Sequence, residues 1–156
     1  METLLDPINL APNLLVTGFA LWVLWFAWTR GGSVERFMAV FNTAEWLGWW
    51  AIALAGAVLR GDPRPPWMVP WLFDFAEAAA FLWLAIRHDN RWMALGAAAQ
   101  GVQMGVRASG LIVGEMNSAF AYFVGTTVYV MSVVMGVAIA GSAMTHRRRT
   151  AAAASA

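Results

Sequence analysis

Residues 67–86 read WMVPWLFDFAEAAAFLWLAI, an apolar stretch that carries two carboxylates. A helix needs about 20 mostly apolar residues to cross a bilayer, so this stretch is long enough to form a transmembrane span. Ionisable side chains inside a span are costly and usually face a partner or water in the bundle interior. Asp74 and Glu77 are three residues apart and share one helix face. The stretch therefore predicts a membrane helix whose polar face is turned toward other helices.

Four other stretches have the same length and apolar character. Together with the first they predict five spans, at residues 10–29, 37–59, 67–86, 92–114 and 119–144. Short polar or proline-rich breaks separate them, as between antiparallel neighbours in a helical bundle. We expect an all-α, polytopic transmembrane helix bundle over residues 1–145 and a basic, then alanine-rich cytoplasmic tail over 146–156. Four spans are the alternative, because one carboxylate-bearing stretch could be re-entrant.

The composition agrees with a membrane protein and excludes several kinds of chemistry. Of the 156 residues, 60% are hydrophobic and 12% are charged, whereas a soluble domain carries roughly twice that charged fraction. The absence of cysteine excludes disulfides and thiolate sites. Ten basic residues against nine acidic ones leave no nucleic-acid footprint. There is no phosphate-binding loop, zinc-peptidase motif or nucleophile elbow. We therefore expect no enzyme activity, no cofactor or metal, and no nucleic-acid partner.

The positions of the arginines predict the orientation in the membrane. Cytoplasmic loops carry an excess of basic residues. If the tail with Arg147, Arg148 and Arg149 is cytoplasmic, the inside segments hold seven arginines and the outside segments two. The bias predicts an outer N-terminus and an inner C-terminus, with the three tail arginines as topology anchors on anionic lipid headgroups. We expect the protein in the cytoplasmic (inner) membrane of a bacterium or of a phage-infected bacterium.

The polar residues inside the predicted spans are the main candidates for function. Their depth in antiparallel helices predicts three contacts, namely Asp74 with Arg107, Glu77 with Gln103, and Glu45 with Gln100. One arginine can neutralise only one of three carboxylates, so another should be protonated, hydrated or paired between subunits. The network either holds the helices together or lines a water-accessible pathway that takes up protons or cations. Both interpretations stay open.

A second set of polar residues extends this interior. Asn42 lies on the same face as Glu45, and the last span carries Tyr122, Thr126, Tyr129 and Ser132 at helical spacing. These residues predict a polar bundle interior. Five tryptophans lie away from the span ends or cluster together, and we expect them to pack against lipid or neighbouring helices, with an aromatic cage for a cation as the alternative; they are Trp22, Trp25, Trp46, Trp49 and Trp50.

Small residues mark another face of the fourth span. Ala97, Gly101, Gly105 and Ser109 recur every four residues and include a GxxxG pattern, which lets helices approach closely. Gly136 belongs to a similar small face on the last span. We interpret both faces as helix packing within one chain, with homo-oligomer contact as the alternative.

The architecture resembles that of the small multi-span phage holins. The likeness depends on the Gly101–Gly105 pair, the polar stripe through Arg107, the Arg147–Arg149 run and the near absence of mass outside the membrane. It implies timed self-assembly of copies in the lipid bilayer into lesions that permeabilise the membrane. A cell-wall hydrolase would then act downstream without direct contact. The alternatives are a small ion- or proton-coupled carrier or channel that uses the buried carboxylates, and an accessory or scaffold subunit of a membrane complex.

Overall fold

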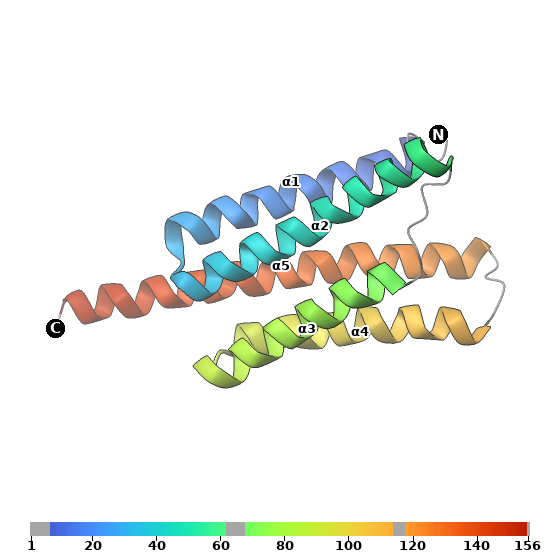
Figure 1. Cartoon of the computed structure of the whole chain (residues 1–156). Helices are drawn as coiled ribbons and strands as arrows, with labels where there is room; N and C mark the ends of the chain where they lie inside the picture. Colours follow the sequence, from blue (N-terminus) through green and yellow to red (C-terminus); the bar gives the residue numbers. More distant parts are fainter. Residues whose placement is uncertain (1–6, 62–67, 114–117, 156) are drawn as a thin grey trace.

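The computed structural model describes residues 7–61, 68–113 and 118–155, and these residues form helices without any strand. The helices are α1 (Pro7–Arg30), α2 (Ser33–Arg60), α3 (Met68–His88), α4 (Arg91–Val113) and α5 (Ser118–Ala154) (Figure 1). Each predicted span falls on one helix, so the all-α prediction is confirmed. Only α5 extends far beyond its span, because the basic tail continues it as helix to Ala154.

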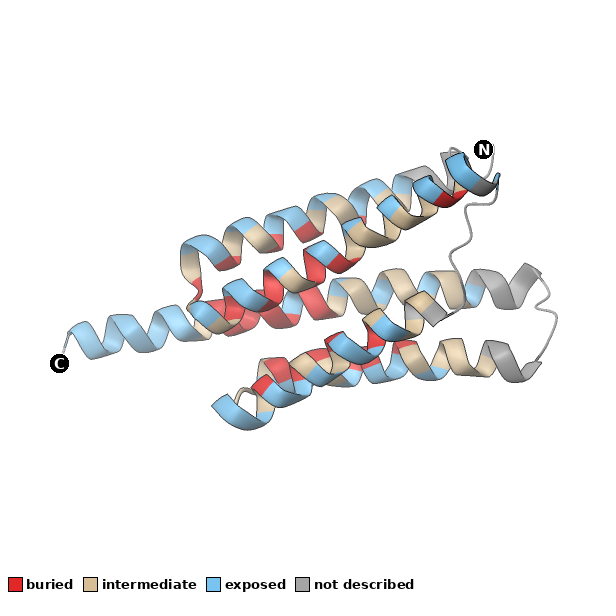
Figure 2. Cartoon of the chain, viewed as in Figure 1, coloured by how far each residue is buried: buried red, intermediate tan, exposed pale blue. Residues whose placement is uncertain are grey.

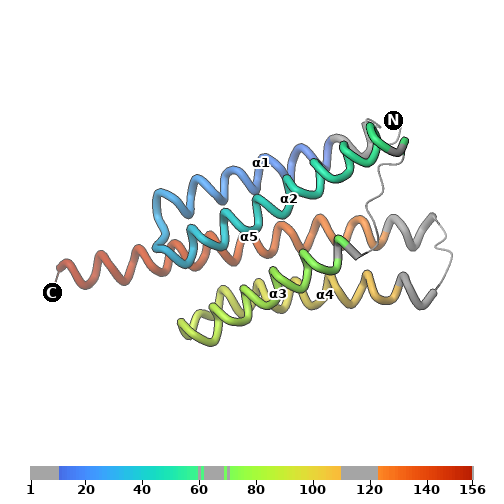
Figure 3. The backbone as a smooth tube through the Cα atoms, in the orientation of Figure 1, coloured from blue at the N-terminus to red at the C-terminus, as the bar shows by residue number. Residues whose placement is uncertain are grey.

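Successive helices run in opposite directions. The tube in Figure 3 shows α1 and α2 as one antiparallel pair and α3 and α4 as another. Helix α5 packs mainly against α4 and α1, whereas α2 and α3 have fewer contacts with each other. The α1–α2 turn, the α3–α4 turn and the C-terminal part of α5 therefore lie at one end of the bundle. We call it the arginine-rich end, because it holds Arg30, Arg36, Arg87, Arg91 and Arg147 to Arg149.

Local capping residues explain where the helices begin and end. The carboxylate of Glu35 accepts a 2.9 Å hydrogen bond from the Gly32 amide at the start of α2, as in half of a capping box. Helix α2 ends at Gly61, whose φ of 69° is the left-handed conformation that glycine adopts easily. Asn90 caps α4, since its Oδ1 accepts hydrogen bonds from the Trp92 and Met93 amides.

Apolar side chains face outward on all five helices, while several polar ones are buried. The described exposed residues include Leu54 and Val58 on α2, Leu72 and Phe75 on α3, and Val102 on α4. Figure 2 shows exposed positions along every helix and buried ones concentrated where the helices face each other. Within the described residues, Ala11–Arg30 and Phe123–Ala154 are each long and apolar enough to cross a membrane. The chain is thus a helical bundle with two candidate membrane-spanning helices.

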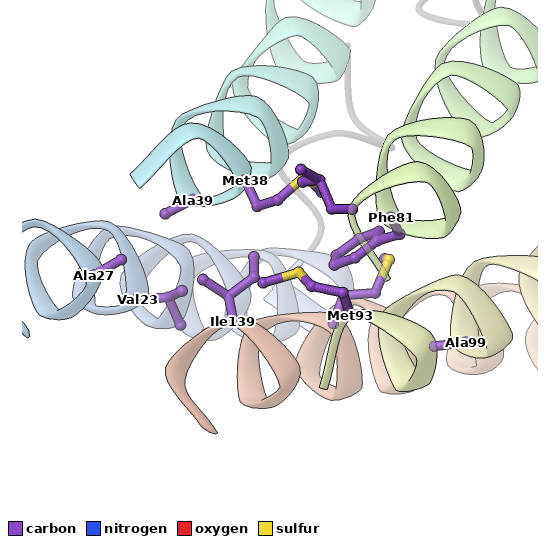
Figure 4. Packing of buried hydrophobic residues seen from close by; sticks show 10 residues of the cluster. Val23, Ala27, Met38, Ala39, Phe81, Met93, Ala99 and Ile139 are labelled. Carbon is purple, nitrogen blue, oxygen red and sulfur yellow. The ribbon is translucent and has the colours of Figure 1, made fainter. Parts of the chain in front are cut away.

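The apolar core lies toward the arginine-rich end. It includes Val23, Met38, Phe81, Met93 and Ile139, one from each helix. Figure 4 shows Met38, Phe81, Met93 and Ile139 pointing toward one another from four different helices. This core closes the bundle on the arginine-rich side, next to the polar residues described below.

Glycines allow close packing at positions other than the predicted GxxxG pair. Gly96 of α4 lies against the ring of Phe81, and a Cβ at that position would collide with it. Phe19 and Val23 of α1 pack against Gly136 of α5. The prediction of packing within the chain is therefore confirmed for Gly136.

The same prediction is wrong for the GxxxG pair itself. Gly101 and Gly105 are exposed, and a Cβ at either would meet no atom within 4 Å. Of the other two members of that stripe, Ala97 packs partly against the core and Ser109 is half-buried, with its hydroxyl bonded to the Val106 carbonyl. The physical reason is that α4 turns Gly96, one residue before Ala97, toward α3 and thereby rotates the GxxxG pair outward.

Candidate functional site

A cavity of about 320 Å³ lies inside the bundle, and all five helices contribute to its lining. On α1 it is lined by the segment from Asn13 to Ala20, and on α5 by the segment from Gly125 to Met135. On α1 to α4 the lining residues lie farther from the arginine-rich end than the buried core residues do, and on α5 Met135 belongs to both sets. The cavity is therefore in the half of the bundle where α1 begins, and the apolar core separates it from the arginine-rich end.

Asp74 of α3 is the centre of a polar cluster beside this cavity, and both of its carboxylate oxygens have partners. Its Oδ2 lies 2.7 Å from Nη1 of Arg107 on α4. Its Oδ1 accepts hydrogen bonds from Nε2 of Gln100 at 3.0 Å and of Gln103 at 3.1 Å. Asp74 is fully buried, and its charge is thus balanced by one guanidinium and two amides from the same face of α4. The predicted contact between Asp74 and Arg107 is confirmed.

The other two predicted contacts are wrong. Gln103 was expected opposite Glu77, and Gln100 opposite Glu45, but both glutamines donate to Asp74. An ionised carboxylate can accept several hydrogen bonds. The ion-paired Asp74 therefore accepts hydrogen bonds from both glutamines of α4 as well as from Arg107. Depth along the helices places residues at the same level but does not show which way each one points.

Glu77 points instead toward α2. Its Oε1 accepts a 2.9 Å hydrogen bond from Nδ2 of Asn42. The carboxyl group of Glu45 lies near that of Glu77, and both side chains line the cavity. Both glutamates are buried. Two ionised carboxylates in such a position repel each other, so this pair requires a proton or a cation between or beside them.

Several acceptor oxygens around the pair are unpartnered. Among the described residues, Oε2 of Glu45, Oε2 of Glu77 and Oε1 of Gln103 are buried and receive no hydrogen bond from a donor. All three side chains line the cavity. Oε1 of Gln100 is also buried without a donor. Buried acceptors of this kind are costly, and they indicate a site that a cation or a hydrogen-bond donor would complete.

Aromatic side chains form another part of the cavity wall. Trp46, Trp49 and Trp50 of α2 line it together with Tyr129 of α5. The rings of Trp46 and Tyr129 meet edge to face, with centroids 6.2 Å apart and an angle of 63°. The Arg107 guanidinium lies 5.4 Å from the centroid of Trp49. The face of Trp49 is therefore already occupied by the arginine that pairs with Asp74.

Hydrogen bonds at their polar tips hold two of these rings in place. Nε1 of Trp46 donates to Oγ1 of Thr17 at 2.8 Å. The hydroxyl of Tyr129 donates to Oδ1 of Asn13 at 2.9 Å. Both partners belong to α1. The aromatic wall is thus preorganised by contacts among α1, α2 and α5.

The polar residues predicted on α5 do not all face the bundle interior. Ser132 lines the cavity, with its hydroxyl bonded to the Val128 carbonyl of its own helix. Thr126 is exposed, so its expected place in the polar interior is wrong; it lies three residues before Tyr129, but the inward face of α5 is set by Tyr129 and Met135 instead. The side chain of Tyr122 lies outside the described residues.

The tryptophans and the tail arginines also divide by position. Trp22 and Trp25 are exposed, which agrees with packing at the surface, whereas Trp46, Trp49 and Trp50 line the cavity. The three tail arginines, Arg147, Arg148 and Arg149, are exposed on α5.

A second buried polar cluster at the arginine-rich end was not predicted. The hydroxyl of Ser142 donates to Oε1 of Glu35 at 2.6 Å and accepts from Nδ2 of Asn90 at 2.6 Å. It connects the α1–α2 turn, the α3–α4 turn and α5. A sequence signal exists for two of its members, because Glu35 and Asn90 stand at capping positions. Their common contact with Ser142 has no such signal.

No family model, curated protein or solved structure matches this chain. Among the described residues, no three histidine, aspartate or glutamate side chains converge in a way that could hold a metal ion. The chemistry of the site therefore has to be inferred from its own residues.

Proposed function

We propose that the chain is an integral membrane protein with five spans that acts as a small cation- or proton-coupled carrier through Glu45 and Glu77. The observation that carries this proposal is the buried carboxyl pair, which lines a cavity and forms no ion pair with an arginine of the described residues. The guanidinium of the half-buried Arg107 nearby is bonded to Asp74. A site with surplus negative charge in a membrane interior is typical of ion and proton pathways.

The outward faces of α2, α3 and α4 support five spans. Among the described residues these three helices are not candidate spans by length and hydropathy, and each carries polar side chains along its length. Those side chains are turned inward, as Glu45, Asp74 and Gln100 are. Exposed leucine, valine and phenylalanine remain on the outer surface, and water would be a poor solvent for that surface. The arginine-rich end would face the cytoplasm.

The apolar core favours a carrier over a permanently open channel. Met38, Phe81 and Met93 belong to the apolar core, which lies between the cavity lining and the arginine-rich end. A permeant ion at Glu77 could reach the arginine-rich end only after these side chains separate. Methionine side chains are flexible and repack easily, which suits a barrier that opens transiently.

Flux measurements on proteoliposomes test the proposal. The purified chain is reconstituted, and a pH-sensitive dye inside the vesicles reports proton movement when a cation gradient is applied. We expect flux that Glu77→Gln abolishes, because the amide cannot exchange a proton. Asp89→Asn is the matched control, since Asp89 is exposed in the α3–α4 turn and asparagine tolerates its positive φ of 44°. Wild-type vesicles without flux, or full flux in Glu77→Gln, would overturn the proposal.

A holin-like pore of the cytoplasmic membrane is the second candidate, and one observation favours it. Gly101 and Gly105 form an outward-facing surface on which no part of the described chain packs, as a helix contact between copies would require. Induced expression in a bacterium separates the candidates. A pore predicts abrupt loss of membrane potential, and lysis when a cell-wall hydrolase is supplied. A carrier predicts graded flux without lysis, and an accessory subunit predicts neither but co-purifies with a larger complex.

A further inference from the structure

The cavity is larger than a proton or a single bare ion requires. Its volume is about 320 Å³, whereas one water molecule takes about 30 Å³ of liquid. Pockets for small organic ligands begin at roughly 300 Å³. The cavity therefore has room for a compact organic molecule beside the carboxyl pair.

The charged groups on the cavity wall indicate whether that molecule is positively or negatively charged. Glu45 and Glu77 contribute carboxyl groups whose Oε2 atoms receive no hydrogen bond from a described donor. Arg107 also lines the cavity, but its guanidinium is paired with Asp74 and lies over the face of Trp49. The wall thus offers negative charge and open acceptors, which a positively charged ligand would satisfy.

The aromatic wall adds a preference for an organic cation. Aromatic faces attract ammonium groups, most strongly when they come from tryptophan and when water is excluded. Trp46 and Tyr129 present surfaces at 63° to each other, and Trp50 lies beside them on the cavity lining. Their hydrogen bonds to α1 keep the rings in place without using their faces. An inorganic ion would need none of these surfaces.

We propose that this cavity binds an organic monocation, a protonated amine or a quaternary ammonium group, between the Glu45–Glu77 carboxyls and the rings of Trp46, Trp50 and Tyr129. The charged group lies next to the carboxyls, and its alkyl substituents contact the rings. This inference rests on the proposed function, because it names the class of substrate for the same site. The same ammonium chemistry occurs in free amines and in choline-type lipid headgroups.

Binding to the full chain in detergent micelles tests the inference directly. Choline and tetraethylammonium are titrated while tryptophan fluorescence and heat are recorded. The neutral isostere 3,3-dimethylbutanol has the shape of choline without its charge and serves as the matched ligand control. We expect saturable binding of both cations and none of the alcohol. Equal binding of the alcohol, no binding of either cation, or equal displacement by sodium or potassium would overturn the inference.

Variants locate the binding site. Glu77→Gln should weaken choline binding by more than about thirtyfold, since it removes a buried charge partner. Trp50→Leu should weaken it about tenfold through loss of the aromatic face. Trp25→Leu is the matched control, because Trp25 is exposed and does not line the cavity. Near-ultraviolet circular dichroism of each variant reports folding. A folded Trp50→Leu protein that binds as the wild type does would contradict the aromatic wall, and weaker binding in Trp25→Leu would place the site elsewhere.

Two further comparisons separate the sources of the cation and the two proposals. In nanodiscs of phosphatidylcholine, added choline should fail to bind if the lipid headgroup fills the cavity, whereas nanodiscs of phosphatidylglycerol should restore binding. Equal binding in both lipids assigns the site to a free amine. Choline binding without any flux would sustain this inference and end the carrier proposal. Flux that choline neither drives nor inhibits would sustain the carrier and end this inference.

Discussion

Arg107 Nη1 and Asp74 Oδ2 lie 2.7 Å apart and join α4 to α3 across 33 positions of the chain. The carboxylate is fully buried, and the guanidinium side chain is 16% exposed. The pair therefore fixes the register of the two helices at one level, with Gln100 and Gln103 completing the coordination of Asp74. It also leaves the two glutamates nearby without a cationic partner among the described residues.

Removing the guanidinium should be more harmful than removing both charges. Arg107→Gln leaves Asp74 as a buried charge without a counterion, and we expect a loss of roughly 3–5 kcal/mol in the free energy of unfolding. The double variant Asp74→Asn, Arg107→Gln leaves neutral amides and should lose clearly less. Unfolding by sodium dodecyl sulfate in mixed micelles measures the two single variants, Arg107→Gln and Asp74→Asn, and the double variant. Losses in the double variant equal to the sum of the single losses would show that the two residues are not coupled.

The features that the sequence predicts correctly depend on position along the chain. Five apolar stretches of about 20 residues predicted the five helices, because the length of a stretch is visible in the sequence. The contact between Asp74 and Arg107 followed from equal depth in two antiparallel helices, and the structure has it. Both inferences use distance along a helix axis, which is 1.5 Å per residue.

The features that the sequence does not predict depend on rotation about the helix axis and on contacts between distant turns. Whether Gln103 meets Glu77 or Asp74 is decided by how α4 is turned, and the contact of Gly96 with Phe81 sets that turn. Gly101 and Gly105 form a GxxxG pattern, whereas Gly96 belongs to no recognisable pattern. The sequence therefore predicts packing on the wrong face of α4. Likewise, Ser142 meets Glu35 across 107 positions, and no local pattern connects them.

The contact between Gly96 and Phe81 predicts a sharp difference between two glycines of one helix. Gly96→Ala places a methyl group inside the buried ring of Phe81, and overpacking of this kind costs about 1–3 kcal/mol. Gly101→Ala meets no atom within 4 Å, so it should be neutral or slightly stabilising. Thermal unfolding in detergent compares the two variants. A Gly101→Ala protein as destabilised as Gly96→Ala would show that α4 is rotated differently.

Ser142 should matter more for stability than its single hydroxyl suggests. Ser142→Ala removes the acceptor of Asn90 and the donor to Glu35, and both groups are left in a largely buried site. Each unsatisfied buried group costs about 1–3 kcal/mol. Thr150→Ala is the matched control, because Thr150 is exposed and its hydroxyl bonds only carbonyls of its own helix. Chemical unfolding of both variants checks the difference, and indistinguishable midpoints would refute a role for the cluster.

The number of spans can be tested without first removing any native thiol, since the chain has no cysteine. Single cysteines are placed at His88, at Thr150 and at position 62 between α2 and α3. His88 and Thr150 are exposed and lie at the arginine-rich end. With five spans and the arginine bias of cytoplasmic segments, a membrane-impermeant maleimide should label position 62 in intact spheroplasts. It should label the other two positions only in inside-out vesicles.

The labelling pattern distinguishes five spans from four because α3 must separate position 62 from His88. If α3 were re-entrant, both positions would react from the same side, while Thr150 would report the C-terminus independently. Ala27→Cys supplies the buried reference position, since Ala27 is fully buried in the core and should react only after denaturation. Labelling of Ala27→Cys in intact membranes would mean that water reaches the core at the arginine-rich end. The barrier between the cavity and the cytoplasm would then be absent. A channel would then explain the buried carboxyl pair better than a carrier does.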